Sequence, residues 1–227
     1  MQKRKNSFVY RLLVIASLSS GIILNLYHTT SLASILSYYT LQINIMCLIA
    51  FIVFEIADIA NKKYRLHELY YAVKGTVIIA VLIMTIVYEI ALSPNRFEMD
   101  SLQNSINNNK QLANFLVHEL SPWLVILDYF LFDDKGNFKL YYPIIWLFVP
   151  LNYVFYVYSY SANGGKFYNL GGSKEFAYFF LDYKQIGYNG VIKWLLFMSM
   201  VILILGYILI WIDYMLAKQQ KKKVRRQ

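Results

Sequence analysis

The stretch VIKWLLFMSMVILILGYILIWIDYML, residues 191–216, decides the fold class of this protein. Within it, only Lys193 and Asp213 carry a charge. About 20 consecutive apolar residues are enough for a helix to cross the hydrocarbon core of a membrane. A basic tail follows immediately, so the stretch predicts a transmembrane helix that ends at a charged membrane surface.

Five further apolar stretches of similar length precede this one. The chain has 227 residues, of which 58% are hydrophobic and 15% are charged, and its mean hydropathy is +0.42. Because six crossings use most of that length, the sequence predicts a single all-α membrane domain over residues 1–227, without a separate soluble domain. The six predicted spans are residues 8–27, 39–58, 70–92, 111–132, 141–161 and 191–216.

The distribution of basic residues predicts the orientation of these spans. With six crossings, most of the 22 Lys and Arg residues fall on the side that carries both chain ends. Basic flanks stay in the cytoplasm, so we expect a multi-pass protein of the cell membrane with cytoplasmic N- and C-termini. The basic residues of the tail, which should contact anionic lipids, are Lys218, Lys221, Lys222, Lys223, Arg225 and Arg226.

Membrane lipids are therefore the expected partners. The formal net charge of +9 does not indicate nucleic-acid binding, because the aromatic and basic residues are not interleaved as in such sites. The N-terminus resembles a signal peptide, and we interpret it as an uncleaved first helix. The single cysteine, Cys47, lies within a predicted span and excludes an intramolecular disulfide.

Polar side chains inside a membrane are costly unless they have partners, so each is a candidate for function. Of the three histidines, only His118 lies within a predicted span, in its outer half. An interhelical hydrogen bond is the alternative interpretation of this residue. The spans hold no second histidine for haem ligation, and no His, Cys, Asp or Glu partners have the spacing of a zinc site. The sequence therefore predicts neither a cofactor nor a metal.

The second span carries a polar stripe. Thr40, Asn44, Cys47 and Phe51 follow one another at intervals of three or four residues, which places them on one helical face. Such a stripe indicates a face toward the bundle interior or toward a wet pocket. Alternatively, Thr40 bonds to the backbone at the helix end, and Asn44 joins two helices.

The predicted topology brings Thr40 and His118 to the same, outer half of the membrane. A threonine hydroxyl needs a neighbouring base to act as a nucleophile, and an imidazole can be that base. The sequence thus predicts a catalytic pair formed by Thr40 and His118. Candidates for orienting the imidazole or binding substrate are Asn44, Asn152, Tyr153, Tyr156 and Asp182.

The remaining charges near span ends are interpreted as structural residues that pair or extend toward the membrane surface: Arg11, Glu55, Asp58, Lys74 and Asp213. Residues 93–110 are expected to form a flexible surface loop. Residues 162–190 mix glycine with aromatic residues and predict either an interfacial anchor or a lid. The sequence shows neither an internal repeat nor a buried charge relay, which disfavours a transporter.

Three short motifs occur in order along the chain: SYYTLQINIM at 37–46, NFLVHELSPWLVILDYFLF at 114–132 and FAYFFLDYKQIGYNG at 176–190. In order and spacing they resemble the androgen-induced membrane protein family, which are threonine-histidine hydrolases of fatty acid esters of hydroxy fatty acids. The resemblance implies that the family's nucleophilic threonine falls on Thr40 and its histidine on His118. Phe179 stands where many relatives have proline.

The sequence thus leads us to expect an intramembrane carboxylic ester hydrolase, in which His118 takes the proton of Thr40 as Thr40 attacks an acyl carbonyl. One alternative is a lipid or small-molecule transporter or binding protein that uses the same polar pocket. Another is a non-catalytic membrane scaffold. A scaffold predicts that Thr40 and His118 lie far apart, with no cavity between them.

Overall fold

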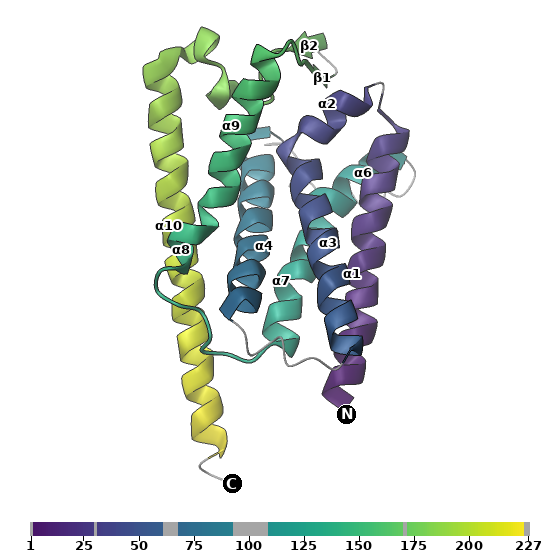
Figure 1. Ribbon diagram of the computed structural model, residues 1–227, viewed down its shortest axis with the longest axis vertical. Coiled ribbons are helices and arrows are strands. Elements are labelled where there is room, and N and C mark those ends of the chain that lie inside the picture. Colours follow the sequence, from purple (N-terminus) through teal and green to yellow (C-terminus); the bar gives the residue numbers. More distant parts are fainter. Residues whose placement is uncertain (1, 30, 61–67, 93–108, 170–171, 225–227) are drawn as a thin grey trace.

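The computed structural model describes residues 2–29, 31–60, 68–92, 109–169 and 172–224, and these form a bundle of long helices (Figure 1). The helices are α1 (Gln2–Tyr27), α2 (Leu32–Ser37), α3 (Tyr39–Ile59), α4 (Glu68–Val87), α6 (Asn109–Phe115), α7 (Ser121–Phe132), α8 (Tyr142–Trp146), α9 (Phe148–Ala162) and α10 (Tyr183–Val224). Two π-helical turns, η2 (Tyr88–Leu92) and η3 (Leu116–Leu120), extend α4 and join α6 to α7. A 3₁₀ turn, η4 (Phe179–Leu181), precedes α10.

Six helical segments are long and apolar enough to cross a membrane. They are residues 6–27, 39–59, 68–90, 111–132, 142–162 and 183–222, so the number of spans and five of their positions agree with the prediction to within a few residues. The last helix begins earlier than predicted, at Tyr183, because its first turns are polar and carry no hydropathy signal. Gly187 interrupts it with a φ of 68°, a left-handed conformation that glycine adopts without strain.

Both chain ends lie at one end of the bundle, which we call the terminal end (Figure 1). The opposite end carries α2 and an antiparallel hairpin of β1 (Phe167–Asn169) and β2 (Gly172–Lys174), and we call it the hairpin end. This hairpin is the one departure from an all-α fold in the described residues. Large apolar side chains remain exposed on the outer surfaces, among them Leu13, Phe155 and Trp211. Such exposure suits a surface that faces lipid.

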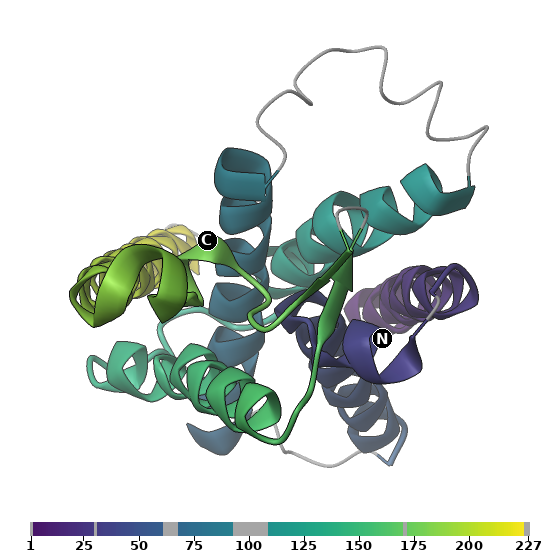
Figure 2. The ribbon, with the colours of Figure 1, turned by 90° about the horizontal axis from the view of Figure 1, so that it is seen from above.

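The helix α4 lies in the middle of the bundle (Figure 2). It packs against α3, α7 and α8, while α10 packs against α8 and η4. At Gly75 of α4 a Cβ atom would overlap the Trp146 ring of α8, so glycine is required for this close approach. The Trp146 indole N–H donates a hydrogen bond to the Ala72 carbonyl at 3.1 Å, which fixes the ring against α4.

A network of buried charges joins four of the helices near the terminal end. Arg11 of α1 forms ion pairs with Asp58 of α3 at 2.7 Å and with Asp128 of α7 at 3.0 Å. Lys74 of α4 pairs with Asp128 and lies 3.4 Å from Asp133. The ion-pair network, as we name it, comprises Arg11, Asp58, Tyr70, Lys74, Asp128 and Asp133, with the Tyr70 hydroxyl donating to Asp133 at 2.5 Å.

This network corrects one sequence-based prediction. Arg11 and Lys74 do pair, but both side chains are fully buried and do not extend to the membrane surface. The structure adds buried ion pairs that the sequence did not indicate, because Asp128 and Asp133 supply carboxylates that hydropathy alone did not single out. Asp213 is structural as expected: it accepts hydrogen bonds from Tyr129 and from the backbone of Gly136 and Phe138.

Two loop predictions have different outcomes. Of the expected surface loop 93–110, residues 93–108 lie outside the described part of the chain. The segment 162–190 is folded over the hairpin end, where Phe167 and Leu181 are buried. Its strand β1 is tied to α2, because the Tyr168 amide donates to the Ser34 hydroxyl at 2.7 Å. Its η4 turn forms part of a cavity wall, described next.

Candidate functional site

The segment that carries His118 is a π-helical turn next to a proline. The Ser121 amide donates to the Leu116 carbonyl, five residues back, and Pro122 has no amide hydrogen to donate. The carbonyls of Val117 and His118 therefore lose the donor that a regular helix provides at this position. Neighbouring helices replace it: Asn44 of α3 donates to Val117 at 3.2 Å, and Thr85 of α4 donates to His118 at 3.0 Å.

These bonds fix the turn in place beside α3. The Asn44 amide also donates to the Thr40 carbonyl at 2.8 Å, so one side chain connects the backbone of Thr40 with the residue before His118. Asn44 is completely buried. Its position confirms the interpretation of an interhelical hydrogen bond, and it also makes Asn44 the residue that sets the spacing between the two candidate catalytic segments.

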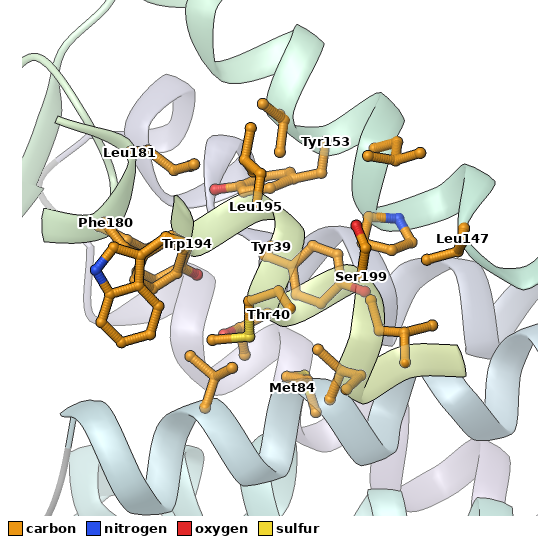
Figure 3. A pocket seen from close by; sticks show the side chains of 18 of the residues that line it. Tyr39, Thr40, Met84, Leu147, Tyr153, Phe180, Leu181, Trp194, Leu195 and Ser199 are labelled. Carbon is orange, nitrogen blue, oxygen red and sulfur yellow. The ribbon is translucent and has the colours of Figure 1, made fainter. Parts of the chain in front are cut away.

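A cavity of about 90 Å³ lies at this level of the bundle (Figure 3). Both Thr40 and His118 line it, together with aromatic and aliphatic side chains from α4, α9 and α10. Figure 3 shows the labelled side chains that line it, among them Tyr39 and Thr40 of α3 and Trp194, Leu195 and Ser199 of α10. Thr40 and His118, which the sequence predicts as a pair, thus both line one cavity, although they lie on helices far apart in the chain.

His118 is held by stacking as well as by its backbone. Its ring lies parallel to the Tyr88 ring of η2, with ring centroids 3.5 Å apart and an interplanar angle of 8°. His118 is buried, with 7% of the residue exposed, and it lines the cavity. The stacking restricts rotation of the His118 ring.

The hydroxyl environment of Thr40 includes a tyrosine that sequence reasoning missed. Tyr178, on the segment before η4, lines the same cavity as Thr40 and Tyr153 and interacts electrostatically with both. Burial raises the pKa of Tyr178 above its ordinary value, so it stays a neutral phenol that can donate a hydrogen bond. The density of aromatic residues in 176–183 was the available signal, but it did not distinguish a pocket wall from an interfacial anchor.

The other candidate residues divide between this cavity and other positions. Tyr153 lines the cavity, and its hydroxyl donates to the Ser37 carbonyl at 3.2 Å. Tyr156 bonds to the Ser37 hydroxyl at 2.8 Å and is not part of the cavity wall. Asn152 and Asp182 are likewise outside this wall. Asn152 faces a separate groove, and Asp182 accepts the Lys184 amide hydrogen at the start of α10.

Two more residues of the cavity wall were not singled out from the sequence. Tyr88 stacks on His118, and Ser199 places a hydroxyl on the α10 side. Neither lies in a recognisable motif, because their roles depend on which helix faces the cavity. Within the ranges that the structure describes, no group of three His, Cys, Asp or Glu residues lies close enough to hold a metal ion.

Comparisons of this chain with protein-family models, with curated proteins and with solved structures found no match.

Proposed function

We propose that this protein is an intramembrane carboxylic ester hydrolase that acts on lipid esters. The observation that carries the proposal is the shared cavity: Thr40 and His118, from different helices, line one small cavity whose other walls are mostly apolar. A nucleophilic hydroxyl and a base that meet inside an apolar cavity are the minimum required for acyl transfer to threonine.

The proposed reaction has two steps. As the Thr40 oxygen attacks the acyl carbon of the ester, His118 accepts the hydroxyl proton. The ester bond breaks, the alcohol leaves with the proton from His118, and the acyl group remains on Thr40. His118 then takes a proton from water, whose oxygen attacks the acyl-threonine, and Thr40 is released with its proton restored.

Tyr178 is placed to assist this reaction. Its phenol lies next to Thr40 and is neutral at ordinary pH, so it can donate a hydrogen bond to the oxygen that becomes negative during attack. The remainder of the wall suits a hydrocarbon chain. It is formed by α9 and α10 side chains that include Leu151, Val154 and Met198.

The proposed location is the cell membrane, with both termini in the cytoplasm. The support is the excess of Lys and Arg at the terminal end. The cavity then lies in the half of the membrane away from the cytoplasm, because it is near the hairpin end. The three motifs that resemble the androgen-induced membrane protein family support fatty acid esters of hydroxy fatty acids as the first substrates to test.

The test is hydrolysis of a panel of lipid esters by the purified protein and by two single variants. Thr40→Ala and His118→Ala should each lower turnover by about 10²-fold or more, since nucleophile and base act as one unit. Each should also abolish labelling by a fluorophosphonate probe. Thr40→Ser is the matched control, because it keeps a hydroxyl and should keep activity. Full turnover in either alanine variant would remove the mechanism.

A lipid transporter or binding protein is the second candidate function. The ion-pair network favours it, because ionisable residues buried within membrane helices are frequent in transporters. This alternative predicts that lipid moves between the leaflets of sealed vesicles while the ester remains intact. Because this alternative uses the same pocket, it also predicts that Thr40→Ala changes that movement, and that neither the variant nor the unmodified protein cleaves the ester.

A further inference from the structure

The cavity that holds Thr40 and His118 also has a buried phenol in its wall. Tyr39 of α3 lines the cavity and is only 8% exposed. Its hydroxyl oxygen is buried and has no hydrogen-bond partner among the described residues. A buried hydroxyl without a partner is destabilising, and most such groups in proteins are bonded to protein or to water. Its position in a cavity wall therefore indicates a ligand that forms hydrogen bonds.

A second hydroxyl of the wall belongs to Ser199 of α10. Figure 3 shows Tyr39 and Ser199 among the side chains that line the cavity. The proposed reaction uses neither of them, because the nucleophile, the base and the oxyanion donor are Thr40, His118 and Tyr178. Two hydroxyls thus remain in a cavity whose other walls are mostly apolar.

A polar groove adjoins the cavity at Tyr39. Tyr39 and Tyr153 belong to the walls of both, and their rings meet edge to face with centroids 5.0 Å apart. The Tyr153 hydroxyl donates to the carbonyl of Ser37, the last residue of α2, so this shared wall lies at the hairpin end. The groove runs between α3 and α9, and its polar side chains include Gln42, Asn152 and Ser159. Polar surface therefore extends from the hairpin end to the cavity wall.

We propose that Tyr39 and Ser199 bind a water molecule in the cavity, and that this water releases the acyl group from Thr40. This role rests on the proposed function. A cavity needs only about 10–15 Å³ to hold a water, which must also find at least two polar partners. The cavity of about 90 Å³ has that room, and the two hydroxyls are such partners. The alcohol product leaves before the water reacts, which frees further space.

The release step uses every bonding position of the water. One hydrogen passes to His118 as one lone pair of the oxygen forms a bond to the acyl carbon. The bond between the acyl carbon and the Thr40 oxygen then breaks, Thr40 takes the proton from His118, and a carboxylic acid leaves. One hydrogen and one lone pair of the water remain for positioning. A hydroxyl both donates and accepts, so Tyr39 and Ser199 together can bind both.

Burst kinetics with p-nitrophenyl octanoate and the purified full chain separate the two steps of the reaction. Acylation of Thr40 releases p-nitrophenol in a burst, and the later steady rate reports deacylation by water. In Tyr39→Phe and in Ser199→Ala the burst should be unchanged. The steady rate should fall about two- to tenfold, the range expected for one hydrogen bond. Octanoyl-Thr40 should accumulate, as measured by mass spectrometry of acid-quenched protein.

Tyr142→Phe is the matched control. Tyr142 of α8 is buried like Tyr39, but its hydroxyl donates to the Glu68 carbonyl at 2.9 Å, and it lines neither the cavity nor the groove. This variant should unfold at a lower temperature and keep both kinetic phases. Tyr39→Phe should unfold no earlier than the unmodified protein, because it keeps the ring and removes a hydroxyl that has no protein partner.

A second measurement requires no turnover. X-ray radiolysis converts a bound water to hydroxyl radicals, which oxidise the side chain beside it even where that side chain is buried. Tyr39 should be oxidised in the full chain in detergent, and Ser199→Ala should lower this oxidation. Tyr142, which is 1% exposed and bonded to protein, should remain unmodified.

Three results would overturn the proposal: a burst that slows as much as the steady rate, a steady rate that neither variant changes, or a Tyr39 that radiolysis leaves intact. The first would mean that the hydroxyls act on the ester itself or only support the fold. A protein that cleaves no ester but is oxidised at Tyr39 would instead reject the proposed function and retain the water site.

Discussion

The two ends of the helical bundle treat buried polar groups in opposite ways. At the terminal end, Arg11, Lys74 and Asp128 are fully buried and paired with one another, and they line neither the cavity nor the groove described above. At the hairpin end, Thr40 and His118 border a cavity. The paired charges at the terminal end join helices, whereas Thr40 and His118 border a space between helices.

The same comparison appears within the hairpin end. Like the residues of the ion-pair network, Asn44 is buried and joins two helices. Its amide donates hydrogen bonds to backbone carbonyls. Thr40, one helical turn away, presents its side chain to the cavity. Substitutions that remove a joining residue should therefore affect stability, while those that remove a cavity residue should affect activity alone.

The largest effect on stability should come from the centre of the ion-pair network. Asp128→Asn removes the nearer of the two carboxylates that Arg11 and Lys74 share, and removing one partner of a buried pair costs about 3–5 kcal/mol. Thermal unfolding in detergent should show a strongly lowered midpoint. Asp58→Asn is the control, because Asp58 is 16% exposed and should cost less. Equal midpoints for both variants would contradict a central role for Asp128.

A smaller loss of stability should accompany the removal of Asn44. In Asn44→Leu the Val117 carbonyl loses its interhelical donor, which costs about 1–3 kcal/mol. Since Asn44 also holds the Thr40 backbone, ester hydrolysis should fall together with the unfolding temperature. Thr85→Val removes the corresponding donor to His118 and serves as the comparison. Full activity in Asn44→Leu would show that the spacing does not depend on this amide.

Replacing Pro122 should change the geometry more than the stability. Pro122→Ala supplies an amide hydrogen that can bond to the carbonyl of Val117 or His118, in competition with Asn44 and Thr85. We expect the free energy of unfolding to change by about 1 kcal/mol or less. Hydrolysis should decrease, because a regular helix would rotate His118 relative to Thr40. Unchanged turnover would mean that the π-helical turn is not needed for the site.

The smallest effect should arise on the exposed segment over the hairpin end. A hydrogen bond from Lys184 at 2.5 Å, reinforced by Lys166, holds the pKa of Glu175 below its ordinary value. The pKa of this carboxyl is lower in the folded state than in the unfolded state. The contribution of the pair to the stability of the fold is therefore present above the ordinary pKa of Glu175, and it is lost as the pH falls through the folded-state pKa.

Lys184→Ala should therefore return the pKa of Glu175 toward its ordinary value, as measured by carboxyl-carbon NMR. The pair is exposed and screened by water, so the unfolding midpoint at neutral pH should not move detectably. A large drop in the midpoint would show that this surface pair stabilises the segment over the hairpin end far more than its exposure suggests.

The number of spans, their approximate limits and the candidacy of Thr40 and His118 follow from the sequence alone. Hydropathy is a sum over neighbouring residues, so it locates a helix without knowledge of its partners. A histidine or threonine within such a helix is conspicuous for the same reason. These features are local; the structure confirms the six spans, and Thr40 and His118 both line one cavity.

The tertiary structure alone decided what each polar group faces. Arg11 meets Asp128 across 117 positions of sequence, and Asn44 meets Val117 across 73. Asn152 and Asp182 were candidates beside His118, but the rotation of α9 and the start of α10 place them elsewhere. Partner choice depends on how helices rotate and pack against one another, and that arrangement is set by contacts along the whole chain, which no local pattern encodes.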